Sequence, residues 1–268
     1  MSGRRSREVD SVSTVRIHWL RHGKIASHRG NVPLTEEGLA QARERGRALA
    51  EEISPGEVVH FMHAPTLRTR QTVEEVRASM EKALGSDSGV ELLEVREQGA
   101  IRNPDIFVAG QRVEMVSSVK ALAEQLSAPP MEPETLADHP FFSAFLAFSD
   151  RIGYWVEHPD PPGEDAVAVA RRQMTFATSL LDKKEDRPLR YVFSTHSPVL
   201  RAILLCYLGE DPGEPGHLES IDLTLSRGEA PELCFRDRRR ALSGTAAGER
   251  APRRTPYGGQ ASECEQRA

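Results

Sequence analysis

Residues 14–23 read Thr-Val-Arg-Ile-His-Trp-Leu-Arg-His-Gly, and this stretch predicts the first strand of the chain. Apolar side chains alternate with polar ones at Val15, Ile17 and Trp19, which is the pattern of a half-buried β-strand. The strand is expected over Thr14–Leu20, and the chain breaks at Gly23. Arg21 and His22 therefore stand just beyond the end of a strand.

The residues that follow predict a β-α-β-α order. Thr35 is a good N-cap for a helix that ends at Pro55-Gly56. Its apolar residues recur at helical spacing, at Leu39, Ala42, Gly46, Leu49 and Ile53. A strand over Glu57–Met62, a helix over Thr66–Leu84 and a short strand over Val90–Val95 come next. This alternation favours a parallel sheet.

The rest of the chain is less regular. We expect, in order, a helical segment near Val113–Leu126, an aromatic helix at about Pro140–Val156, a helix over Glu164–Leu181, a buried strand over Arg190–Ser194, a helix over Pro198–Leu208 capped by Ser197, and a hairpin of Ile221–Ser226 with Glu232–Phe235. The ends, residues 1–13 and 241–268, are polar and predicted to be disordered. One domain is therefore expected over residues 14–240, with a helical insertion at about 100–163.

Composition excludes several classes of protein. The 268 residues carry a net charge of -5, with 38% apolar and 28% charged residues. An acidic chain argues against a nucleic-acid partner despite the basic run Arg236–Arg240. No stretch approaches the roughly 18 apolar residues of a membrane span. Three scattered cysteines favour a reducing cytoplasm, and a homodimer is left open.

Three short segments place Arg or His just after a strand or at a helix start. They are Arg21-His22, Arg68 within Leu67–Thr72, and His196 within Ser194–Ser197. Ligands of parallel α/β sheets bind at the carboxyl ends of the strands, where helix N-termini also attract anions. Guanidinium groups bind phosphate oxygens bidentately, and an imidazole can attack phosphorus. Two arginines and two histidines thus predict a phosphoryl site.

These segments resemble the histidine phosphatase (phosphoglycerate mutase-like) superfamily. Arg21-His22-Gly23 is similar to its RHG signature, and the stretches at 33–38, 68–72 and 195–197 are similar to its further motifs, in the same order. The resemblance spans about Val15 to Phe235. It implies a three-layer α/β/α sandwich with a mostly parallel central sheet and a helical insertion over the active site.

The resemblance also implies roles for individual residues. His22 would be the nucleophile, Arg21 and Arg68 would bind phosphoryl oxygens, and His196 would stabilise the transferring group. Asn31, Ser197, His28 and His63 are further candidates for phosphate or substrate contact. No metal and no cofactor are expected, because the arginines supply the charge stabilisation that magnesium would otherwise give.

The spacing around residues 92–99 departs from the family pattern, so two residues are candidates for the general acid. Glu97 is the preferred residue, and Glu94 is the alternative. Only nine residues separate Gly23 from Pro33, which favours a hydrolase over a mutase. We therefore expect a metal-independent phosphoric monoester hydrolase that acts on a small phosphorylated metabolite through phosphohistidine on His22. The alternatives are a mutase-like phosphotransferase and a catalytically weak phosphate-binding protein.

Overall fold

The computed structural model describes residues 14–27, 30–183 and 185–242. Within these residues the chain divides into two compact units. The first comprises the residues up to 102, residues 172–196 and the residues from 215 onward, and the second comprises residues 103–171 and 197–214. The candidate His28 lies outside the described residues, as do residues 1–13 and 243–268 of the ends predicted to be disordered.

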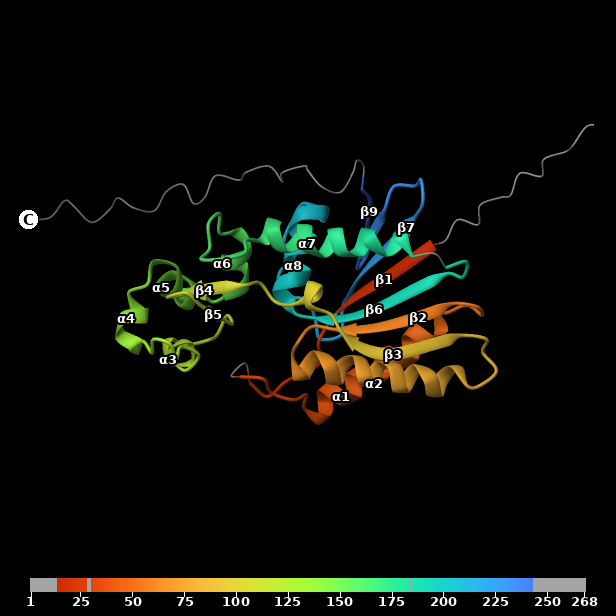
Figure 1. Ribbon diagram of the computed structural model, residues 1–268, viewed down its shortest axis with the longest axis horizontal. Coiled ribbons are helices and arrows are strands. Elements are labelled where there is room, and N and C mark those ends of the chain that lie inside the picture. The colour runs from red at the N-terminus through yellow and green to blue at the C-terminus, as the bar shows by residue number, and fades with distance from the viewer. Residues whose placement is uncertain (1–13, 28–29, 184, 243–268) are drawn as a thin grey trace, which may run out of the picture. The chain divides into compact units, whose positions relative to one another are not determined.

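The first unit is built on a seven-stranded sheet of order β3-β2-β6-β1-β7-β8-β9 (Figure 1). Its strands are β1 Thr14–Arg21, β2 Val58–His63, β3 Glu91–Glu97, β6 Leu189–Thr195, β7 Ser220–Ser226, β8 Glu232–Phe235 and β9 Arg238–Ala241. Strands β3, β2, β6 and β1 are mutually parallel, whereas β7 runs antiparallel to β1. The carboxyl ends of the four parallel strands therefore share one edge of the sheet, as the sequence predicts.

Helices cover both faces of this sheet. Helices α1 (Glu36–Glu51) and α2 (Leu67–Leu84) lie on one face (Figure 1). The core there consists mainly of buried aliphatic side chains from α1, α2 and the parallel strands, including Leu20, Ala42, Leu49, Val59, Phe61, Val73, Val76, Met80 and Val192. On the other face, the indole N–H of Trp19 donates to buried Gln173 of α7 (Ala166–Ser179) at 3.1 Å. The predicted three-layer α/β fold is confirmed.

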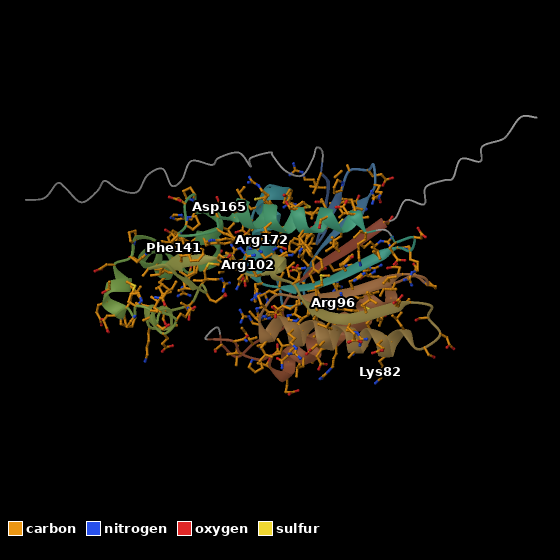
Figure 2. The ribbon with its side chains drawn as sticks, viewed as in Figure 1. Lys82, Arg96, Arg102, Phe141, Asp165 and Arg172 are labelled. Atoms are coloured by element: carbon orange, nitrogen blue, oxygen red, sulfur yellow. The ribbon has the colours of Figure 1, made fainter. Side chains whose placement is uncertain are left out.

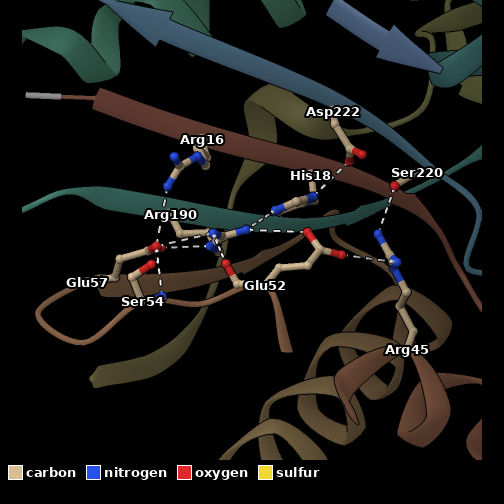
Figure 3. A network of polar contacts seen from close by, with 9 residues as sticks. All are labelled: Arg16, His18, Arg45, Glu52, Ser54, Glu57, Arg190, Ser220 and Asp222. Atoms are coloured by element: carbon tan, nitrogen blue, oxygen red, sulfur yellow. Dashed lines mark hydrogen bonds and ion pairs between the residues drawn. The ribbon is translucent and has the colours of Figure 1, made fainter. Parts of the chain in front are cut away.

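A buried polar network crosses the sheet beneath the C-terminal end of α1 (Figure 3). Arg190 of β6 binds both carboxylate oxygens of Glu57, at 2.8 and 3.3 Å, and both side chains are almost fully buried. Arg190 also donates to Nε2 of His18 at 2.8 Å. Because an arginine can only donate, His18 must donate from Nδ1 to Asp222, at 2.7 Å. The chain of contacts thus links the amino end of β2 to β6, β1 and β7.

The second unit differs most from the expectations. It contains β4 Ile106–Val108, β5 Gln111–Val113, α3 Val119–Ala123, α4 Pro133–Ala137, α5 Pro140–Ala147, α6 Arg151–Glu157 and α8 Ser197–Leu208. The helix predicted near Val113–Leu126 is wrong for its first part, because Val113 ends a strand of a hairpin whose turn has positive φ at Ala109 and Gly110. Only α3 is helical in that segment.

The predicted aromatic helix is two helices. Phe141, labelled in Figure 2, packs in α5 against Phe145 and Tyr154, with ring centroids 5.5 and 5.6 Å apart. Helix α5 ends at Ala147, and Asp150 starts α6 by accepting the Gly153 N–H. An aspartate in this position is a strong N-cap, which explains the break.

The end of the folded chain is also one strand longer than predicted. The basic run after Phe235 forms β9, which pairs with β8, and the buried Leu242 follows it. The predicted boundary at residue 240 therefore falls inside this strand. No helix in the described part of the chain combines the length and apolar composition that a membrane crossing requires.

Candidate active site

His22 lies just beyond the carboxyl end of β1, where its backbone N–H donates to Thr195 of the neighbouring β6 at 3.0 Å. Its ring is buried, with 4% of the residue exposed. Nδ1 lies 2.8 Å from the carbonyl oxygen of Gly23. Because that carbonyl can only accept, Nδ1 carries the proton, and Nε2 keeps its lone pair. This is the tautomer that a nucleophilic imidazole needs.

The surroundings keep His22 neutral. Burial makes the largest contribution to lowering the pKa of its imidazole, and the charges of Arg68, Arg21 and His217 lower it further. The hydrogen bond to Gly23 acts in the opposite direction but does not outweigh them, and the pKa falls to about 3. At neutral pH the Nε2 lone pair is therefore available for attack.

Two glycines and a threonine fix the loop that carries His22. The N–H of Gly23 donates to the hydroxyl of Thr72 in α2 at 3.0 Å. A Cβ on Gly23 would lie 2.7 Å from the carbonyl oxygen of Gly38 in α1, so this close approach requires glycine. Lys24, next in the chain, forms an exposed ion pair with Glu37 at 2.5 Å.

The first turns of α2 place Arg68. Its guanidinium is close enough to His22 to lower the pKa of that ring, and only 9% of Arg68 is exposed. Gln71 accepts the Leu34 N–H at 2.8 Å, while Thr72 holds the His22 loop. In the motif at 68–72, Arg68 therefore supplies positive charge to the site, while Gln71 and Thr72 hold the neighbouring loops through hydrogen bonds.

Arg21 ends β1 and is equally buried, at 9% exposure. Its Nη1 donates to the carbonyl of Pro215 at 2.5 Å. Its backbone N–H donates to Glu219 at 3.1 Å, and its carbonyl accepts from Leu218 at 3.0 Å. Arg21 therefore fastens the loop that precedes β7 to the same edge of the sheet.

His196 follows β6 and completes the predicted group of four. Its ring centroid lies 5.4 Å from that of His22, with the planes at 69°, and the residue is 3% exposed. The preceding Thr195 is held by its hydroxyl, which donates to Ile101 at 2.6 Å. The structure thus brings the rings of His22 and His196 together, and the charges of Arg21 and Arg68 act on the His22 ring.

Two further histidines lie at this edge. His217 has its ring centroid 6.2 Å from that of His22, and sequence reasoning missed it. The only sequence signal was its position in a turn-rich stretch before the half-buried strand β7. His63 ends β2, and its Nδ1 lies 2.7 Å from the Ala64 carbonyl, the same arrangement as in His22.

The two candidate acids differ in placement. Glu97 ends β3, opposite His63 in the register of β2 and β3, and is exposed. Glu94 lies three residues earlier, where the register of the two strands shifts, and contacts Arg77 of α2 at 3.3 Å. Only Glu97 stands at the carboxyl edge of the sheet.

The remaining candidates have structural contacts. The Asn31 side-chain oxygen accepts the Leu67 N–H at 2.6 Å, which supplies the α2 cap that Thr66 does not. Ser197 belongs to the second unit, where its hydroxyl donates to Glu214 at 2.5 Å.

The segment after Glu97 is also anchored within the first unit. Arg172, which Figure 2 labels together with Arg102, donates to the carbonyls of Ala100 and Arg102 at 2.6 and 3.2 Å. Gln173 adds a bond to the Ala100 carbonyl at 2.8 Å. These contacts hold the chain just beyond the carboxyl end of β3.

Comparisons with known proteins bear on the family and the fold of this chain. Residues 17–93 match the model of the histidine phosphatase superfamily (branch 1). No curated protein matches the sequence. Among solved structures, the mycobacterial glucosyl-3-phosphoglycerate phosphatase complexed with VO3 is similar at 16% identity, a TM-score of 0.51, and coverage of 83% of this chain and 98% of that one. Phosphoglycerate mutase from Bacillus anthracis str. Sterne is similar at 15% identity, a TM-score of 0.52, and coverage of 85% and 93%. The resemblance of this chain to the histidine phosphatase superfamily, predicted from its motifs, is confirmed by the match of residues 17–93, and the two solved structures share its fold.

Proposed function

We propose that the chain is a phosphoric monoester hydrolase that forms a covalent phosphohistidine on His22. The observation that carries the proposal is the state of this ring: buried, neutral, and protonated on Nδ1 by the contact with Gly23. The family match supports a phosphatase or phosphotransferase. Small phosphorylated metabolites are the proposed substrates.

In the first step, Nε2 of His22 attacks phosphorus as the P–O bond to the leaving group breaks. Arg21 and Arg68 stabilise the charge on the phosphoryl oxygens, and His196 lies beside the ring from which the new P–N bond forms. The arginines supply this stabilisation without a divalent ion, so we propose a metal-independent reaction.

The leaving oxygen departs on the side opposite His22 and takes a proton from an acid. We assign this role to Glu97. This residue ends β3 at the carboxyl edge of the sheet, which is the same edge at which the nucleophile follows β1. Glu94 is disfavoured by its position within the strand and its ion pair with Arg77. In the second step, water attacks phosphorus, gives a proton to Glu97, and the P–N bond to His22 breaks.

We also propose a cytoplasmic location. Cys206 and Cys234 are free thiols among the described residues, which suits a reducing compartment.

The test is to trap the intermediate. Enzyme that is mixed with a phosphorylated substrate and quenched in base should carry one acid-labile phosphate on His22, and His22→Ala should carry none while remaining folded. Label on a serine, aspartate or cysteine would refute the mechanism. Transfer of the label to an acceptor alcohol in place of water would identify a mutase-like phosphotransferase.

A further inference from the structure

His217 lies on the short loop before β7, next to the nucleophile. Its ring centroid is 6.2 Å from that of His22, and the ring planes meet at 45°. A hydrogen bond from a ring N–H to an oxygen spans about 2.7–3.2 Å. A phosphoryl group bonded to Nε2 of His22 would therefore lie close enough to His217 for one of its oxygens to accept a hydrogen bond from that ring.

The loop that carries His217 is held on several sides. Besides the three contacts with Arg21, the Gly216 N–H donates to the Glu219 carboxylate at 2.6 Å. That carboxylate also accepts two hydrogen bonds from Arg236, at 2.6 and 3.0 Å. His217 is therefore fixed relative to Arg21, whose guanidinium belongs to the same site.

The residue after His217 has an unusual backbone. Leu218 adopts φ 60°, a conformation that residues with a side chain rarely take. Its side chain is buried in the core cluster that includes Leu20, and its N–H donates to Arg21. Strained backbone of this kind persists only where the surrounding structure enforces it, and it is concentrated at functional sites. Here the buried Leu218 side chain and its N–H bond to Arg21 hold this conformation in the residue next to His217.

We propose that His217 is a further substrate-contacting residue, which donates a hydrogen bond from its imidazole to the phosphoryl group held by His22, Arg21, Arg68 and His196. The proposal rests on the proposed function, because it assumes that this site takes a phosphate. It gives the site a donor on the β7 side, in addition to those from β1, α2 and β6. A phosphoryl group that carries close to two negative charges benefits from each added donor.

The experiment measures binding of inorganic phosphate to the full chain by titration calorimetry, which requires no turnover. The variants are His217→Leu, which removes the donor, and His217→Gln, which keeps an N–H. The control is His60→Gln in the middle of β2, a partly buried histidine that stacks on Tyr191 with ring centroids 4.4 Å apart. Loss of a hydrogen bond to a charged group predicts about ten-fold to a hundred-fold weaker binding for His217→Leu. His217→Gln should lie between that variant and the wild type, and His60→Gln should bind as the wild type does.

Wild-type affinity in His217→Leu would overturn the proposal. An equal loss in His217→Leu and His217→Gln would overturn it as well, because the loop and not the donor would then be responsible. A wild-type protein that binds phosphate through His217 but forms no phosphohistidine would contradict the proposed function alone. A protein that forms phosphohistidine and binds phosphate equally well without His217 would contradict this inference alone.

Discussion

Replacing Arg190 by Met should destabilise the first unit strongly, because it leaves a buried carboxylate without its main partner. The side chains of Arg190 and Glu57 are 2% and 1% exposed, and they share two hydrogen bonds. Removing one partner of a buried ion pair costs about 3–5 kcal/mol. Arg16, at 3.3 Å, and the Ser54 N–H, at 3.1 Å, still contact Glu57, so we expect a loss near the lower figure.

The pH dependence gives a second readout of the same pair. Burial raises the pKa of Glu57, but the hydrogen bonds and charge of Arg190 outweigh it and hold the pKa below its usual value of 4.5. The wild-type protein therefore has this stabilisation above pH 4.5 and loses it as pH falls through the lower folded pKa. In Arg190→Met the effect of burial dominates, so the pKa of Glu57 rises. Protonation of Glu57 in acid then removes the cost of burying its unpaired charge. The stability difference between wild type and variant should thus shrink as pH falls toward about 4.

The assay is urea unfolding followed by tryptophan fluorescence. The chain has two tryptophans, and in a Trp155→Phe background Trp19 of β1 reports on the first unit alone. The double variant Arg190→Met with Glu57→Leu should recover most of the loss, because a well-packed apolar pair often replaces a buried ion pair without cost. A loss below about 1 kcal/mol for Arg190→Met at neutral pH, or a difference that grows in acid, would refute the reasoning.

Four further predictions concern the site. Turnover should survive EDTA, and activity that is abolished by chelation and restored by magnesium would contradict the metal-independent reaction. His22, with its pKa lowered to about 3, should be neutral and protonated on Nδ1 at pH 5 by ¹⁵N NMR, whereas a midpoint near 6.5 would contradict the assigned environment. Because the folded pKa lies below the unfolded value, the stability linked to His22 is full above pH 6.5 and falls as pH drops toward 3, so His22→Gln should be less acid-sensitive than the wild type. Glu97→Gln should lose about 10²- to 10⁴-fold of its turnover rate on alkyl phosphates but far less on p-nitrophenyl phosphate, provided that chemistry limits both rates. Glu94→Gln is the matched control. If Glu94→Gln shows this leaving-group-dependent loss and Glu97→Gln does not, the acid is Glu94.

Local patterns predicted the first unit well because its signals are short-range. Thr35 accepts the Gly38 N–H as the N-cap of α1, and the stripe through Ala42 and Leu49 is buried. Those features depend on residues a few positions apart. The second unit gave weaker signals, since the break before α6 depends on Asp150, whose carboxylate also pairs with buried Arg201 at 2.7 Å. Strand β9 was missed for a related reason: its residues are basic, and only pairing with β8 makes them a strand.

The sequence by itself determined which residues end the parallel strands and start the helices, and thereby the positions of Arg21, His22, Arg68 and His196 at those points. These residues follow from local order, because a strand and the loop after it are neighbours in the chain. Glu97 and Glu94 remained undecided, since a register shift between β2 and β3 sets which one reaches the edge. Only the tertiary structure brought in His217, 195 residues after His22. Its place depends on the antiparallel pairing of β7 with β1 and on hydrogen bonds from Arg21, and no local pattern encodes contacts between segments so far apart.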